Sequence, residues 1–210
     1  MELMCEIEQM PLPEQLRHVK LRLRGVMNGV VSHSMREKGL AYKVNFGVEL
    51  PRLREMAGEL PHTASLATAL WKEDIRECRL LATLLMPAGG FEEDLAELWV
   101  EQMRYPEEAE CAVVHLFARL PFASTKAFEW IAADGQMKRL CGWLLLGRLL
   151  MQGARMSDRD SDELLDQAAG EIKGHDLSLR KAAYLTLLRY METGDREQAR
   201  GERLLASLGM

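Results

Sequence analysis

Residues 141–147 read Cys-Gly-Trp-Leu-Leu-Leu-Gly, and a stretch of the same character occurs three more times in the 210-residue chain. Each stretch begins with a small residue and carries an aliphatic residue three positions later. The small residues are spaced by 33, 30 and 41 residues. An irregular period of this length is typical of stacked helix pairs, each of which buries its apolar face against its neighbours. The four stretches are 78–84, 111–117, 141–147 and 182–188.

Three of the four small residues are cysteines, namely Cys78, Cys111 and Cys141, and Ala182 is the fourth. A small side chain at one packing position lets neighbouring helices approach closely. No two of the chain's four cysteines, Cys5 included, have the spacing of a zinc-ligand pair. We therefore expect reduced and buried thiols, with no metal site and no cofactor.

Between the apolar stretches lie turn signals rich in proline, glycine and aspartate, and no stretch alternates with period two. The sequence therefore predicts an all-α fold, a HEAT-like helical-repeat solenoid or alpha-alpha superhelix, in a single domain of residues 1–210. Turns are expected near 61–62, 87–90, 105–106, 121, 134–135, 153–162, 174–175 and 194–195.

Apolar residues recur at helical spacing from Glu14 to Lys38, which predicts one N-terminal helix ending before Gly39. A short extended stretch, 42–48, follows, and Pro51 suits the first turn of the next helix. Because the end of a solenoid must be covered, residues 1–44 are expected to form an N-terminal capping segment. Residues 45–210 then form the helix-pair repeats.

The helices that precede the first three of the four repeated stretches each carry a tryptophan, namely Trp71, Trp99 and Trp130. We interpret these side chains as core packing between repeats. An exposed tryptophan would instead offer a surface for base stacking.

Composition and charge exclude several classes of protein. The chain is 48% hydrophobic with a net charge of −5, which argues against a protein that simply coats nucleic acid. The most apolar run, 140–151, is far shorter than the roughly 20 residues that span a bilayer. The N-terminus is acidic where a secretory signal is basic, so we expect a cytoplasmic protein without a membrane contact. Common catalytic motifs are missing.

Basic residues concentrate near the starts of the second helices. In a curved stack of helix pairs these ends would share one concave face, where helix N-termini add to phosphate binding. Ordinary solvated helix charge is the alternative interpretation. The residues are Arg76, Arg79, Lys138, Arg139, Arg180 and Lys181, and a further cluster, Arg17, Lys20, Arg22 and Arg24, lies on the first helix.

Three motifs resemble one protein family. Residues 45–54, Asn-Phe-Gly-Val-Glu-Leu-Pro-Arg-Leu-Arg, combine a glycine, an aliphatic, a proline and an arginine ahead of a helix. Residues 70–79 hold a Leu-Trp pair, four residues and an Arg-Glu pair, and residues 130–139 lead to an arginine. Together these motifs look like those of the bacterial DNA alkylation repair family, which contains HEAT-like alkylpurine DNA glycosylases.

The resemblance implies a DNA-binding protein that releases N3- or N7-alkylated purines without base flipping. Arg139 matches an arginine that the family turns toward DNA. Glu110 falls near the family's catalytic aspartate, so it is the expected catalytic carboxylate, and Tyr105 would supply an aromatic surface to the lesion or sugar. Leu185 stands where the family has a tryptophan.

The resemblance implies alkylated double-stranded DNA as the partner. Lys138, Arg76, Arg79, Arg180 and Lys181 are the further candidates for contacts with its backbone. A second interpretation is a catalytically inactive helical-repeat scaffold that binds a protein partner on its concave face.

Overall fold

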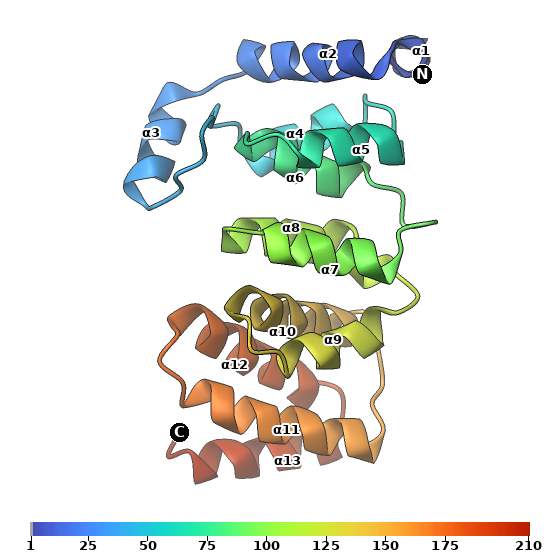
Figure 1. Cartoon of the computed structure of the whole chain (residues 1–210). Helices are drawn as coiled ribbons and strands as arrows, with labels where there is room; N and C mark the ends of the chain where they lie inside the picture. Colours follow the sequence, from blue (N-terminus) through green and yellow to red (C-terminus); the bar gives the residue numbers. More distant parts are fainter. Residues whose placement is uncertain (1) are drawn as a thin grey trace. The chain divides into compact units, whose positions relative to one another are not determined.

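The computed structural model describes the backbone of residues 2–210 and the side chains of residues 6–210. The chain forms two compact units, unit 1 with residues 1–91 and unit 2 with residues 92–210. Both are built from helices (Figure 1), and the described residues contain no strand beyond an isolated bridge between Val44 and Ile75. A compact unit need not fold alone, so one domain over residues 1–210 stays a prediction.

In unit 1, the stretch that the sequence pattern predicted as one helix forms two helices, Leu12–Gly25 and Gly29–Glu37. The chain leaves helical geometry at 26–28, because Asn28 caps the second helix by accepting a hydrogen bond from the Val31 N–H at 3.2 Å. The single helix predicted from Glu14 to Lys38 is therefore wrong. The helices of this unit are α1 (Glu2–Gln9), α2 (Leu12–Gly25), α3 (Gly29–Glu37), α4 (Leu50–Ala57), α5 (Ala64–Trp71) and α6 (Arg76–Leu85).

The extended stretch before α4 is held in place by the first turn of α6. The fully buried carboxylate of Glu77 accepts hydrogen bonds from the N–H groups of Phe46 and Val48, each at 3.1 Å. Arg76 donates to the Val48 carbonyl at 2.9 Å and pairs with Glu77 at 3.2 Å. Backbone groups without strand partners are thus satisfied by side chains.

Gly47 fixes the course of the same stretch. Its φ is +72°, which favours glycine, and a Cβ here would lie 2.2 Å from the Asn28 carbonyl oxygen. The Ser32 hydroxyl also donates to the Asn45 carbonyl at 2.7 Å. The stretch is therefore pinned between α3 and α6.

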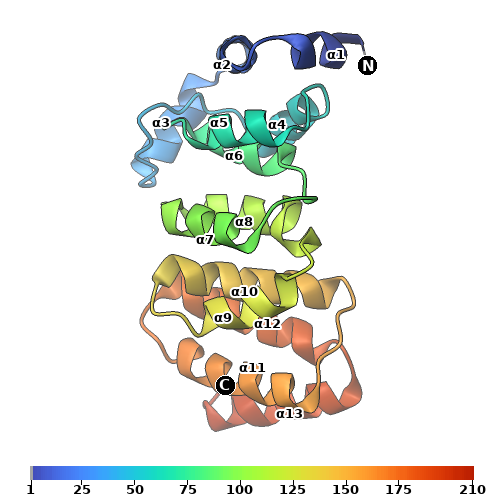
Figure 2. The ribbon, with the colours of Figure 1, turned by 45° about the vertical axis from the view of Figure 1, so that its right-hand side comes forward.

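Unit 2 consists of helix pairs with two layers (Figures 1 and 2). One layer contains the second helices α8, α10 and α12, and α10 packs against both of the others. The other layer contains the first helices α7, α9 and α11, and α13 packs on α11 and α12. The bounds are α7 (Glu93–Gln102), α8 (Pro106–His115), a 3-10 turn (Phe117–Arg119), α9 (Ala123–Ile131), α10 (Gln136–Met151), α11 (Asp158–Ile172), α12 (Leu177–Met191) and α13 (Asp195–Ser207).

The tryptophans of the first helices lie in the core, as the sequence predicted. Trp71, Trp99 and Trp130 are at most 2% exposed. The Trp130 indole N–H donates to Glu97 at 2.7 Å, which satisfies the polar edge of the ring. The three side chains therefore offer no exposed surface for base stacking.

The small residues of the repeat are also buried as predicted. Cys78, Cys111, Cys141 and Ala182 are at most 6% exposed, and the three cysteines carry free thiols. Burial raises the pKa of the Cys78 thiol to about 12. Cys5 lies outside the described side chains.

The aliphatic residue three positions later behaves differently in the two units. Leu81 of unit 1 is fully buried, whereas Val114 and Leu185 of unit 2 are 37% and 47% exposed. Three residues correspond to about 300° around a helix, so this position lies at the border of the buried face. In unit 2 it therefore forms part of the surface.

Helix α10 contains the longest apolar run, and most of its residues are buried, as predicted. Among the described residues, no helix is both long and apolar enough to cross a membrane.

Candidate nucleic-acid interface

An apolar groove of about 310 Å³ crosses the exposed face of the second helices of unit 2. Its walls come from α8, α10 and α12, and all three border aliphatics of the repeat, Val114, Leu144 and Leu185, line it. The remaining lining residues are Glu110, Val113, Trp143, Gly147, Arg148, Met151, Ala182, Thr186 and Arg189. The repeat thus places one side chain from each second helix in a shared surface depression.

Glu110 is the carboxylate of the groove lining. It projects from α8, and its side chain is exposed at the border of the apolar walls. Partial burial raises the pKa of Glu110, the nearby Lys181 opposes that effect, and Glu107 adds to it, so the net pKa lies above the ordinary value. The structure brings Glu110 and Lys181 close enough to interact electrostatically, as two members of the predicted site.

Arg148 and Arg189 also line the groove, although the sequence analysis assigned neither of them to the site. The Nε of Arg148 is buried and has no hydrogen-bond partner among the described residues. The sequence could have predicted this placement, because Arg148 lies four residues, or about one helical turn, after Leu144 and therefore on the same face of α10.

Arg139 lies in a different depression, of about 910 Å³, between the end of α9 and helix α11. Its guanidinium is 3.8 Å from Glu171, which also accepts a hydrogen bond from Trp143 at 3.4 Å. Asp134 and Asp176 line the same depression. Carboxylates therefore surround the arginine that was expected to grip a phosphate.

Lys138 is engaged by two carboxylates of α7. Its Nζ lies 2.9 Å from both Glu97 and Glu101. These contacts, led by the hydrogen bond to Glu101, raise the pKa of Lys138. Glu97 is shared with Lys126, whose Nζ is 3.1 Å away. The charge of Lys138 is thus largely compensated within unit 2.

Arg180, Lys181 and Tyr105 lie at the surface near the helix starts. Arg180 is exposed, and its Nε donates to the Ile172 carbonyl at 3.1 Å. Lys181 is exposed on α12. Tyr105 precedes α8, where Arg104 lies 5.9 Å from its ring centroid. Tyr105 is not among the residues that line the groove, so it does not share the site with Glu110.

Arg76 and Arg79 belong to the interior of unit 1, with 4% and 7% exposure. Arg79 stacks over Trp71, with the guanidinium carbon 4.0 Å from the ring centroid, and donates to the Trp71 carbonyl. Because both guanidinium groups are buried, neither is placed to reach a DNA phosphate, and neither belongs to the proposed interface. Charge near a helix start was a misleading signal here, because both arginines satisfy backbone carbonyls.

The described residues contain no group of three or more His, Cys, Asp or Glu side chains arranged to hold a metal ion.

Comparisons with known proteins identify the family. A family model described as DNA alkylation repair enzyme matches residues 19–200. No curated protein has a significantly similar sequence. A solved structure described as "a new family of proteins related to the HEAT-like repeat DNA glycosylases with affinity for branched DNA structures" is similar with a TM-score of 0.79 and 16% identity, covering 90% of this chain and 80% of that chain. This similarity confirms the predicted HEAT-like helical-repeat fold, and the family match shows that the chain belongs to the DNA alkylation repair enzyme family.

Proposed function

We propose that the protein binds DNA and that the groove of α8, α10 and α12 receives a base or sugar of an alkylated or branched site. Family membership and the fold support this function, since the similar solved structure is described as having affinity for branched DNA. The observation that carries the proposal is the groove itself, in which apolar walls stand beside Arg148 and beside Arg189, which pairs with Glu192 at 2.8 Å and remains 44% exposed. Apolar walls suit a base or sugar face, and arginines suit the flanking phosphates.

Glu110 gives the groove a chemical role. An N3- or N7-alkylated purine is cationic, so its glycosidic bond breaks with a neutral base as the leaving group and leaves an oxocarbenium-like sugar. A carboxylate beside the sugar stabilises this developing positive charge and can orient the attacking water. The water oxygen bonds to the anomeric carbon and its proton passes to Glu110 or to solvent. The products are an abasic sugar and the free alkylpurine.

The first experiment measures release of alkylated purines from methylated duplex DNA, with wild type and with Glu110→Gln. Gln keeps the size of the side chain and removes the charge, so we expect release to fall at least about a hundredfold while DNA affinity changes little. Glu107→Gln is the matched control, because Glu107 lies one turn earlier on α8 and outside the groove lining. Equal release by wild type and Glu110→Gln would refute the catalytic role.

Binding is tested separately from catalysis. Wild type is titrated with a linear duplex and with a four-way junction at about 50 mM salt, where phosphate contacts are strong. We expect Arg148→Ala to weaken binding to both substrates and to reduce the salt dependence by about one phosphate contact. A wild type that binds neither substrate would refute the proposed function as a whole.

A second candidate function is supported by the apolar side chains at the groove. Met151 and Leu185 are 57% and 47% exposed and line the same apolar groove, and contiguous exposed apolar surface is typical of interaction sites. The groove could hold the apolar face of an amphipathic helix from a protein partner. Under this alternative the wild type has no DNA affinity at about 50 mM salt. Leu185→Asp would then abolish binding of the partner.

A further inference from the structure

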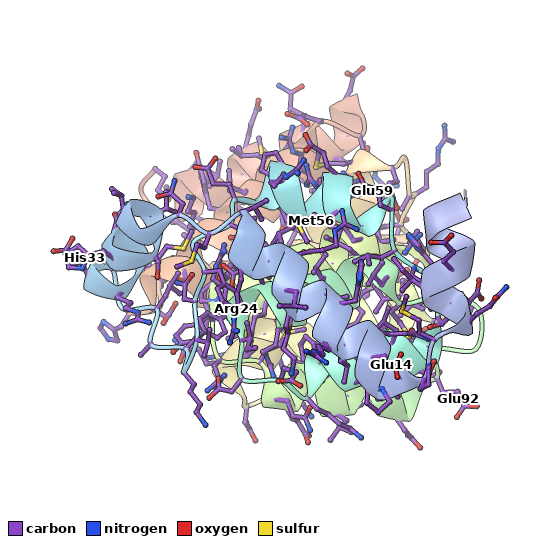
Figure 3. All side chains as sticks on the ribbon, turned by 90° about the horizontal axis from the view of Figure 1, so that it is seen from above. Glu14, Arg24, His33, Met56, Glu59 and Glu92 are labelled. Atoms are coloured by element: carbon purple, nitrogen blue, oxygen red, sulfur yellow. The ribbon has the colours of Figure 1, made fainter. Side chains whose placement is uncertain are left out.

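Helix α2 in unit 1 has an outer face that the proposed function leaves unused. Its inner face is buried through Gln15, Val19 and Leu23. The opposite side bounds a surface hollow of about 510 Å³, and Figure 3 looks onto this end of unit 1, with Glu14 toward the start of α2 and Arg24 toward its end. The hollow is lined by Pro13, Leu16, Arg17, Lys20, Leu21 and Arg24.

The hollow is cationic: three of its six lining residues carry a positive charge and none is a carboxylate. Lys20 pairs with Glu73 at 2.9 Å and remains 35% exposed. Arg17 and Arg24 are exposed, and neither forms an ion pair with any described side chain. The remaining cation of the helix, Arg22, pairs with Glu59 at the flank. These ion pairs hold α2 on the body of unit 1 and leave two guanidinium groups facing solvent.

The spacing of the arginines fits an extended polyanion. Arg17 and Arg24 are seven residues apart, so they share one face of α2 and are separated by about 10 Å along its axis. Lys20 stands between them on the same side. Duplex DNA carries about one negative charge per 1.7 Å of its axis, so a row of cations of this length can meet successive phosphates. Arginine forms bidentate hydrogen bonds with phosphate oxygens.

The distribution of charge along the chain shows that the region containing this surface is basic. Residues 11–43 contain seven Lys or Arg and two Asp or Glu, a net charge of +5 in a protein whose net charge is −5. The rest of the chain therefore carries −10. In unit 2, by contrast, Lys138 and Arg139 lie beside carboxylates. The outer face of α2 thus combines local positive charge with accessible guanidinium groups.

We propose that the outer face of α2 binds the phosphate backbone of duplex DNA and forms a contact separate from the groove of unit 2. This inference rests on the proposed function only in taking DNA as the partner. The arginines grip phosphates, and Leu16 and Leu21 lie against the sugars between them. The contact adds affinity without sequence preference, because phosphates carry no base information.

The test is the double variant Arg17→Ala, Arg24→Ala in the full-length chain, titrated with a linear duplex over a series of salt concentrations. Loss of two phosphate contacts should reduce the slope of log K against log salt by about 1.8 and weaken binding about tenfold or more at 50 mM salt. Arg155→Ala, Arg203→Ala is the matched control, because it removes the same charge from exposed positions in unit 2. Arg17→Lys, Arg24→Lys should keep most of the slope.

The possible outcomes separate the two proposals. If wild type binds no DNA, the proposed function fails. If wild type binds and the α2 double variant keeps its affinity and slope, the further inference alone fails. Equal losses in the α2 variant and in the Arg155, Arg203 control would also overturn it, since general charge would then explain the effect. Vesicles with anionic lipids provide the last arm, and an α2-dependent affinity for vesicles without one for DNA would overturn the assignment.

Discussion

At the scale of single residues, the best-defined part of the protein is the carboxylate of Glu77. Both of its oxygens accept hydrogen bonds from backbone N–H groups of the extended stretch that leads into α4. Glu77 belongs to a motif that resembles the family, but the sequence does not predict its role. A buried carboxylate with a fixed set of donors cannot be distinguished in a sequence from one on the helix surface.

We expect Glu77→Gln to destabilise the protein by about 2–4 kcal/mol, because the amide cannot accept from both N–H groups and leaves Arg76 without its charged partner. Urea unfolding followed by circular dichroism measures the change. Glu73→Gln is the control, since it breaks a partly exposed pair with Lys20 and should cost under about 1 kcal/mol. Similar losses for both variants would contradict the role of Glu77.

Glu110 should affect stability in the opposite direction. Its pKa is raised in the folded chain, chiefly by desolvation, so folded protein holds the proton at a pH where unfolded protein has lost it. Its contribution is therefore favourable below the ordinary glutamate pKa and is lost as pH rises through the folded value. Glu110→Gln should raise the Tm at pH 7 and leave it nearly unchanged at pH 4. A lower Tm at pH 7 would contradict this prediction.

The same protonation should appear in turnover. If Glu110 stabilises the sugar cation, release of alkylpurines requires its ionised form and declines as pH falls through the raised pKa. We expect the midpoint of the pH profile to lie above the ordinary glutamate range. The single-turnover rate constant, measured as a function of pH, gives this midpoint. A rate that does not change between pH 8 and pH 5 would contradict a raised midpoint.

At the scale of elements, helices α9 and α10 pack closely against each other at Gly142. A Cβ on Gly142 would lie 2.6 Å from the Ile131 nitrogen and 2.8 Å from the Ala127 carbonyl oxygen. Backbone atoms cannot move aside as the end of a flexible side chain can. The repeat pattern predicted a small residue at Cys141, but the tighter contact is at its neighbour, because only the three-dimensional packing determines which of the two faces α9.

Gly142→Ala should therefore destabilise the protein by about 1–3 kcal/mol, despite the higher helix propensity of alanine. Gly170→Ala in α11 is a matched control, since nothing lies within 4 Å of its Cβ position, and it should stabilise by about 0.5–1 kcal/mol. Thermal unfolding of both variants makes the comparison. A stabilising Gly142→Ala would show that α9 and α10 can separate at no cost.

The break between α2 and α3 was not predicted from the spacing of apolar residues. Apolar residues continue at helical spacing across it, and the pattern alone therefore favoured one helix. Gly25, Asn28 and Gly29 carried the contrary signal, since asparagine is a strong N-cap residue and glycine is a poor helix former. Local capping chemistry overrides apolar spacing when the two conflict.

At the scale of the whole molecule, the fold was far more predictable than the site. Recurring small residues and the turn signals between them predicted the helix pairs, because residues on the buried face of a helix recur with the helical period. The site depends on which charges find partners: Arg76, Arg79 and Lys138 looked equivalent to Arg180 and Lys181, and only the packed structure separates the buried or paired cations from the exposed ones.

Charge distribution also predicts how molecules share one DNA. Residues 44–210 carry a net charge of −7, so neighbours on the same duplex repel each other at low salt. We expect titration of a duplex of about 60 base pairs to give a Hill coefficient below 1 and incomplete coverage at about 50 mM salt. Fluorescence anisotropy of a labelled duplex measures the isotherm. Cooperative filling to full coverage would contradict this expectation.

The hydrogen bonds between residues 45–48 and the Arg76-Glu77 pair have a consequence for which parts of the sequence evolution preserves. These two stretches belong to two of the three motifs that resemble the family, and they contact each other inside unit 1 rather than at the groove. Selection for folding alone would therefore preserve the signature while the groove residues diverge. Substitutions in the two stretches should therefore covary among homologues. A homologue can keep both motifs even when its groove has changed to bind a different substrate.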